Sequence, residues 1–147
     1  MMSVIEIQSL SKYYGKVRGI HEINLQVEEG EFFGFIGPNG SGKSTAIRTL
    51  LGLIKATSGK AKVFGNDIES QQTAILKDVG YMPSEAMFYS GMRVKDILKL
   101  SAKLRGIDCT EEAEALCARL KLDVLKKVET LSLGNRKKVS IICALQH

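Results

Sequence analysis

The sequence predicts an α/β fold, and three observations carry that prediction. The first third of the chain alternates apolar and polar residues between short turns, which is typical of strands. A run that is apolar on both faces then leads directly into a glycine-rich loop and a helix. From Val94 onward the apolar residues recur at helical spacing. The order of these patterns indicates a sheet-containing first part followed by a helical part.

Length and composition limit the classes of protein to which the chain can belong. At 147 residues, 44% hydrophobic and 25% charged, it can bury the core of one globular domain. No apolar run reaches the roughly 18–20 residues that cross a bilayer, and no signal peptide is visible, so we expect a cytoplasmic protein. The net charge of +5 suits an anionic ligand, an anionic membrane surface or nucleic acid equally well. Three cysteines without metal-ligand spacing are expected to be reduced: Cys109, Cys117 and Cys143.

The strands of the first part are predicted from apolar patterns and turn residues. We expect an antiparallel sheet first, with a turn at residues 14–16. Residues 32–36 are apolar on both faces apart from Gly34, which predicts a strand buried inside a sheet. A helix is expected from Ser44, because the apolar spacing changes there. The predicted strands are residues 3–7, 23–27, 32–36, 60–64 and 79–82.

Three helices are expected in the second part. The first carries an apolar stripe opposite lysines. The second is predicted to open at Asp108, with Glu111 three residues later as in a capping box. The third follows residues 131–134 and is expected to continue to the last residue. The predicted apolar faces are Val94, Ile97, Leu98 and Leu104; Ala113, Leu116, Cys117 and Leu120; and Val139, Ile142 and Cys143.

A phosphate-binding loop of the pattern GxxxxGK[ST] lies between the predicted buried strand and the first helix. Its glycines let backbone N–H groups point at one anion, and the helix N-terminus adds a partial positive charge. Lys43 is expected to reach the β- and γ-phosphates, and Ser44 to supply an oxygen to Mg²⁺. A dinucleotide-binding loop fits worse, because Thr45 stands where that pattern has its last glycine. The predicted loop is Gly37, Pro38, Asn39, Gly40, Ser41, Gly42, Lys43, Ser44 and Thr45.

Together with this loop, residues 131–135 resemble a known family. Their sequence, Leu-Ser-Leu-Gly-Asn, is similar to the LSGGQ signature of the ATP-binding subunits of ABC transporters, and departs from it at Leu133 and Asn135. From the residues alone, Ser132 is an ordinary helix cap. The resemblance implies that Ser132 and Gly134 contact the γ-phosphate held by the other subunit of a head-to-tail dimer.

Two further segments extend this resemblance. Tyr14, just before a glycine, matches the family's adenine-stacking aromatic, with Val17 nearby; taken alone, Tyr14 is more typical of sheet packing. Ser84 stands at the position of the family's Q-loop glutamine, and either Ser84 or Glu85 is implied to reach Mg²⁺ through a water. The pattern at residues 87–96 is most similar to bacitracin-resistance-type ATPases of the drug and antimicrobial-peptide export branch.

Other parts of the family's pattern are missing from the sequence. No apolar strand ending in Asp, the family's Walker B element, follows the loop; His21 and His147 do not match its switch histidine; and no catalytic residue is identified. The resemblance implies an α/β P-loop NTPase core with an N-terminal antiparallel β-subdomain and a helical subdomain, truncated before the Walker B strand. We expect the sheet and loop core at about residues 1–83, the helical subdomain at about 84–133 and the start of the signature helix at 134–147.

The missing strand has a consequence for the chain as it stands. Residues 32–36 and the apolar face of the last helix are expected to remain uncovered, so that the chain associates or packs loosely.

The function implied by the resemblance is to couple ATP binding and hydrolysis to transport through a membrane permease, on the inner face of the cell membrane. ATP and Mg²⁺ are the implied cofactors, and the permease and a second ATP-binding subunit are the implied partners. Two alternatives stay open: a nucleotide-binding fragment without turnover, and a soluble ABC-type ATPase acting on nucleic acid or ribosomes. Nucleic acid is not expected as a partner, because the basic run at residues 136–138 has no aromatic neighbour to stack a base.

Overall fold

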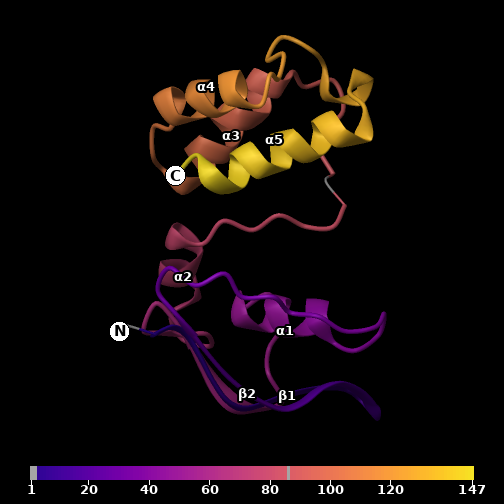
Figure 1. The fold of residues 1–147 in the computed structure, drawn as a ribbon, viewed down its shortest axis with the longest axis vertical. Helices are drawn as coiled ribbons and strands as arrows, with labels where there is room; N and C mark the ends of the chain where they lie inside the picture. The colour runs from indigo at the N-terminus through magenta and orange to yellow at the C-terminus, as the bar shows by residue number, and fades with distance from the viewer. Residues whose placement is uncertain (1–2, 86) are drawn as a thin grey trace. The chain divides into compact units, whose positions relative to one another are not determined.

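The computed structural model describes residues 3–85 and 87–147, and the chain divides into two compact units (Figure 1). We call Met1–Lys77 the sheet unit and Asp78–His147 the helical unit. Each unit buries its own set of apolar side chains, and each is described separately below.

The sheet unit contains four antiparallel strands in the order β2-β1-β3-β4. The antiparallel sheet and the turn after Tyr14 were predicted, and both are confirmed. The long β1–β2 ladder has four register shifts, and two of them contain Ser9 and Glu22, which have φ angles of 48° and 45°. Asn24 Oδ1 accepts the Ser9 N–H and Ser11 Oγ accepts the Glu22 N–H, each at 2.8 Å, so neighbouring side chains satisfy the displaced amides. The strands are β1 (Ser3–Tyr14), β2 (Val17–Glu28), β3 (Ser58–Val63) and β4 (Asn66–Asp67).

Two predicted strands are absent from the structure, and this corrects the sequence-based expectation. Residues 31–38 and 79–82 have no regular secondary structure. The side chains of Phe32 and Ile36 are 103% and 95% exposed, where burial on both faces was expected. A strand is stabilised by hydrogen bonds to a neighbour, and the described sheet pairs only β1 to β4. The prediction of strands at residues 32–36 and 79–82 was therefore wrong, because neither segment pairs with a strand of the described sheet.

Helix α1 (Lys43–Leu50) follows the glycine-rich loop, as expected, and is shorter than its apolar pattern suggested. Its residues Ala46 and Thr49 are buried, and the Thr49 hydroxyl donates to the Thr45 carbonyl at 2.7 Å. Helix α2 (Gln72–Asp78) was not predicted from the sequence. Ile75 is its one buried residue, and a single apolar position does not show the helical repeat of apolar residues.

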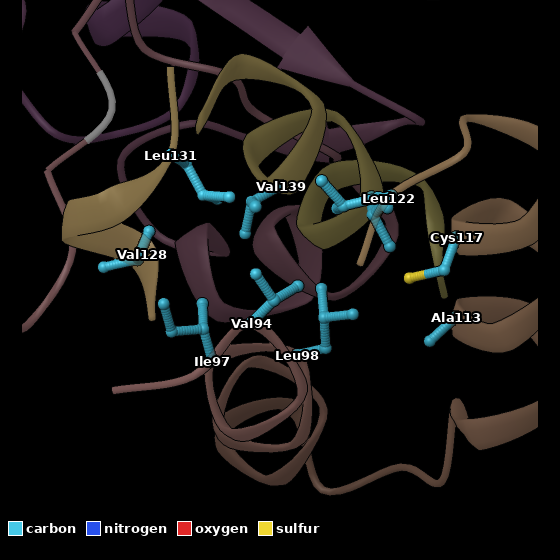
Figure 2. Close-up of a cluster of buried hydrophobic side chains, with 10 residues drawn as sticks. Val94, Ile97, Leu98, Ala113, Cys117, Leu122, Val128, Leu131 and Val139 are labelled. Carbon is cyan, nitrogen blue, oxygen red and sulfur yellow. The ribbon is translucent and has the colours of Figure 1, made fainter. Parts of the chain in front are cut away.

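The helical unit consists of α3 (Val94–Arg105), α4 (Thr110–Arg119), the 3₁₀ turn η1 (Val128–Thr130) and α5 (Leu133–Leu145). A single cluster of buried apolar side chains joins them (Figure 2). Figure 2 shows side chains of α3 and α5 facing one another, with Val94 opposite Val139. The cluster comprises Val94, Ile97, Leu98, Ala113, Cys117, Leu122, Val128, Leu131, Val139 and Ile142.

Four expectations for these helices were wrong. Helix α5 ends at Leu145, with Gln146 as its C-cap, and does not continue to the last residue. Val139 and Ile142 are fully buried, because α3 covers the face of α5 that was expected to stay open. Leu104 is 80% exposed although it was assigned to the apolar stripe of α3. Helix α4 begins at Thr110, because Asp108 Oδ1 accepts hydrogen bonds from the Thr110 N–H and hydroxyl instead of forming the predicted capping box.

Candidate nucleotide site

The loop before α1 adopts backbone conformations that require glycine. Gly40 and Gly42 have φ angles of 82° and 93°, in the left-handed region, and Gly42 is the N-cap of α1. A Cβ atom on Gly42 would collide with the carbonyl oxygen of Gly19 on β2 and would lie 2.7 Å from Cγ2 of Ile20. At Gly40, by contrast, a Cβ would meet no heavy atom within 4 Å. The loop is thus held tightly against β2 at one glycine and open at the other.

The side chain of Lys43 lies across this loop. Its Nζ donates to the carbonyl oxygens of Gly37 at 2.5 Å and Pro38 at 2.7 Å, and lies 3.4 Å from the Ser41 hydroxyl oxygen. An ammonium group has three donors, and these three oxygens occupy them. The loop therefore places a cation among inward-facing oxygens, in the position where phosphate oxygens could replace them. Asn39 lies in the turn before Gly40, whereas Ser44 and Thr45 belong to the first turn of α1, where Ser44 is exposed.

Tyr14 and Thr45 approach the same point of β2. A Cβ on Gly19 would lie 3.0 Å from Cε2 of Tyr14 and 3.1 Å from Cγ2 of Thr45. The predicted base-stacking residue and the end of the predicted phosphate loop are thus brought together at Gly19. Tyr14 is 47% exposed and Val17 is 68% exposed, so both have surface available for a ligand. Gly19 was not predicted from the sequence. Its lack of a side chain lets residues from distant parts of the chain come close together, and no local sequence pattern marks such a glycine.

The other predicted site residues belong to the helical unit. Ser84 and Glu85 lie in an exposed bend after Pro83, and the next residue, Ala86, falls outside the described residues. Ser132 is the N-cap of α5, where its hydroxyl oxygen accepts the Asn135 N–H at 3.3 Å, and this confirms the cap predicted from the residues alone.

Gly134 occupies the first turn of α5. It has open space on the side where a Cβ would stand, and the neighbouring Leu133 is 66% exposed. The start of the helix is therefore accessible.

Residues 3–85 and 87–147 contain no group of three or more His, Cys, Asp or Glu side chains arranged to hold a metal ion. Asp123 accepts the Leu125 N–H at 3.0 Å and so closes a local turn. His21 Nδ1 lies 2.9 Å from the Tyr13 hydroxyl, in a contact between neighbouring strands. These residues have structural partners of their own.

The three cysteines behave as apolar residues. All three are free, Cys109 and Cys117 are buried, and Cys143 is half-buried. Burial raises the pKa of each thiol, so the reactive thiolate form is disfavoured near neutral pH. All three are therefore free thiols that pack as small apolar residues, as predicted.

A cavity of about 570 Å³ lies in the helical unit between α3 and α4. Its walls include Leu98, Ala113 and Cys117, with lysines of α3 at its rim. Gln146 also lines it; the Gln146 amide nitrogen donates to the Leu98 carbonyl at 3.2 Å, and Oε1 is buried without a partner. None of the residues predicted to bind nucleotide line this cavity.

Comparison with known proteins gives the family of the chain. A family model described as ABC transporter matches residues 20–147. The chain is 34% identical over 149 residues to the bacitracin transport ATP-binding protein of Bacillus licheniformis, covering 100% of the chain and 49% of that protein. It is also 34% identical over 152 residues to an uncharacterised ABC transporter ATP-binding protein of Methanocaldococcus jannaschii, covering 100% of the chain and 53% of that protein. The chain thus spans about half the length of the curated relatives it matches.

Solved structures agree with the sequence comparison. The structure of an ATP-binding subunit of an ABC transporter superposes with a TM-score of 0.85 at 26% identity, over 97% of this chain and 62% of that one. A nucleotide-free ATP-binding cassette gives a TM-score of 0.81 at 26% identity, over 99% of this chain and 65% of that one. Within residues 3–85 and 87–147, no helix has the length and apolar character needed for a membrane span. These matches confirm the predicted fold class and resemblance, and the chain belongs to the ATP-binding subunits of the ABC transporter family.

Proposed function

We propose that the sheet unit binds Mg-ATP, and that the whole protein couples ATP binding and hydrolysis to transport through a membrane permease. The observation that carries the proposal is the meeting of Tyr14 and Thr45 at Gly19, next to a loop whose lysine is surrounded by oxygens. An aromatic ring at one end and a phosphate loop at the other are the two contacts that a nucleotide requires. The family of the chain supports the same assignment.

Each residue of the site has a distinct role in this proposal. Backbone N–H groups of residues 40–45 and the Lys43 ammonium hold the phosphates, and the Ser44 hydroxyl is one ligand of Mg²⁺. Tyr14 stacks with the base, beside Val17. Bound Mg-ATP supplies a transferable phosphoryl group, whose charge the metal and the loop neutralise. The residues fit this ligand, because Lys43 already binds oxygens and the loop is open at Gly40.

The helical unit is proposed to contribute contacts beyond this chain. Ser132 and Gly134 stand at an accessible helix start, which suits the phosphate of a nucleotide bound by a second subunit. The exposed bend that holds Ser84 and Glu85 is available, in the same proposal, for a permease contact.

Calorimetry with ATP tests the nucleotide site. Lys43→Ala should remove most of the binding, because it deletes a charge-assisted contact worth about 1.5–3 kcal/mol. Lys60→Ala is the matched control, since Lys60 is an exposed lysine on β3 of the same unit. Equal ATP affinity in folded wild type and folded Lys43→Ala would contradict the proposal.

The partner of the whole protein needs a separate experiment. Co-purification with a membrane permease is the expected result in cells. Salt-sensitive binding to DNA or RNA, without a permease, would favour the nucleic-acid alternative instead.

A further inference from the structure

The ring of Tyr14 is already engaged by a cation. The Lys12 Nζ lies 5.3 Å from the centroid of the Tyr14 ring, within the range in which an ammonium is attracted to an aromatic face. Lys12 precedes Tyr14 by two residues on β1, and alternate residues of a strand point to the same side. The nucleotide-binding motifs do not include Lys12, and the proposed function gives it no role.

We propose that Lys12 is a positioning residue for the nucleotide base, because it holds the Tyr14 ring from one face and leaves the other face for stacking. This inference rests on the proposed nucleotide site. In the proposed arrangement, the Lys12 ammonium, the Tyr14 ring and the base form one stack, in that sequence.

The surroundings of the ring support this order. A Cβ on Gly19 would lie 3.0 Å from both the Lys12 carbonyl oxygen and Cε2 of Tyr14. The backbone that carries Lys12 and the ring atom Cε2 therefore both lie close to Gly19. With Cε2 close to Gly19 and the Lys12 ammonium over the ring, two contacts restrain the ring before any ligand arrives. A ring that is already ordered reduces the entropy lost when a base stacks on it.

The proposal predicts the sign of a mutational effect. If the ammonium only competed with the base for the ring, removing it would strengthen nucleotide binding. If it positions the ring, removing it weakens nucleotide binding and leaves the phosphate contacts unchanged. Inorganic tripolyphosphate has the phosphates without a base, so it separates these contacts from stacking.

The experiment measures the affinity of ATP and of inorganic tripolyphosphate for wild type, Lys12→Ala, Lys12→Arg, Tyr14→Ala and the Lys12→Ala/Tyr14→Ala double variant. Lys12→Ala should weaken ATP binding about two- to fivefold, the size expected for an exposed cation–π contact, and leave tripolyphosphate binding unchanged. Lys12→Arg should retain the ATP affinity, because a guanidinium also stacks on an aromatic face. In the Tyr14→Ala background, Lys12→Ala should have no further effect.

Two controls make the outcome specific. Lys60→Ala removes the same charge from the same unit and should leave both affinities unchanged. In the ligand-free chain, the Tyr14 ring carbon resonances should shift in Lys12→Ala and not in Lys60→Ala.

Several results would overturn the inference. Unchanged or stronger ATP binding by Lys12→Ala would show that Lys12 does not position the ring. An equal loss for tripolyphosphate, or an equal loss without Tyr14, would show that Lys12 acts as a general positive charge. Absence of binding of both ligands to wild type would overturn the proposed nucleotide site together with this inference. If all variants bind tripolyphosphate normally but Lys12→Ala does not weaken ATP binding, the phosphate site stands and only the role of Lys12 is wrong.

Discussion

The Lys43 ammonium donates a hydrogen bond to the glycine-rich loop that precedes it, with Nζ 2.5 Å from the carbonyl oxygen of Gly37. Its second partner is the carbonyl oxygen of Pro38, so the lysine bonds to the backbone on which phosphates are proposed to bind. Each of these bonds has to be exchanged for a phosphate contact when nucleotide binds. The ligand-free loop is thus held in shape by the residue that the ligand is proposed to recruit.

Replacing Lys43 should therefore lower the stability of the ligand-free sheet unit as well as its nucleotide affinity. Lys43→Met keeps most of the side-chain volume and removes the donors, so we expect a loss of about 1 kcal/mol per hydrogen bond at most. Thermal melting without ligand measures this loss, with Lys60→Met as the control. A melting temperature identical to that of wild type would mean that the loop keeps its shape without the lysine.

ATP turnover by the 147-residue chain should stay at background. Phosphoryl transfer needs a carboxylate for Mg²⁺ and a group that orients the attacking water, and no apolar strand ending in Asp follows the loop in the sequence. Phosphate release under saturating Mg-ATP is the assay. Steady release that disappears with Lys43→Ala would show that a carboxylate has been overlooked or comes from another chain.

The apolar segment at residues 32–36 should drive association of the isolated chain. Phe32 and Ile36 are almost completely exposed, and Phe33 and Phe35 are 45% and 39% exposed, which makes a contiguous apolar surface along one segment. Phe32→Ser/Ile36→Ser should reduce binding of a hydrophobic dye and shift size-exclusion elution toward the monomer, without lowering the melting temperature. If Phe32→Ser/Ile36→Ser associates as much as wild type, a different surface must drive the association.

Ile142 should be a major contributor to the stability of the helical unit. It is fully buried in the cluster under α3, so Ile142→Ala leaves a cavity and should cost about 2–5 kcal/mol. Leu104→Ala is the control, because Leu104 is 80% exposed and its truncation should cost less than about 0.5 kcal/mol. Denaturant unfolding followed by helical circular dichroism distinguishes the two. Similar costs at both positions would contradict the packing of α5 on α3.

Glu129 should make the helical unit more sensitive to acid. Its carboxylate accepts the Gly91 N–H at 2.8 Å, and this hydrogen bond lowers the pKa of Glu129 below the ordinary value of 4.5. A carboxyl with a lowered folded-state pKa contributes stability above its ordinary pKa, and that contribution is lost as the pH falls through the folded-state pKa.

Glu129→Gln removes this dependence. Melting temperatures at about pH 7 and about pH 3 should therefore differ less in Glu129→Gln than in wild type. Glu114→Gln, the same change at an exposed position of α4, is the control. An equal acid dependence in wild type and Glu129→Gln would show that the Gly91 contact contributes nothing.

The sequence alone determined the features that depend on neighbouring residues. The loop from Gly37 to Thr45 needs a fixed order of glycines and a lysine within nine positions, and its helix starts where the motif requires. The cap at Ser132 and the buried pair Ala113 and Cys117 on α4 follow from local spacing in the same way. Such features were predictable because capping, helical periodicity and glycine backbone geometry act over a few residues.

Only the tertiary structure decided which of these local patterns found a partner. The apolar segments 32–36 and 79–82 were predicted as strands, yet a strand depends on backbone hydrogen bonds to a neighbouring strand, and neither segment belongs to the described sheet. Val139 and Ile142 read as an uncovered face, yet α3 buries them. The contact of Lys12 with Tyr14 was open to prediction from their shared side of the strand, whereas the approach of Tyr14 and Thr45 to Gly19 was not. That approach joins residues far apart in the chain, and the free energy that stabilises it comes from packing that no local pattern contains.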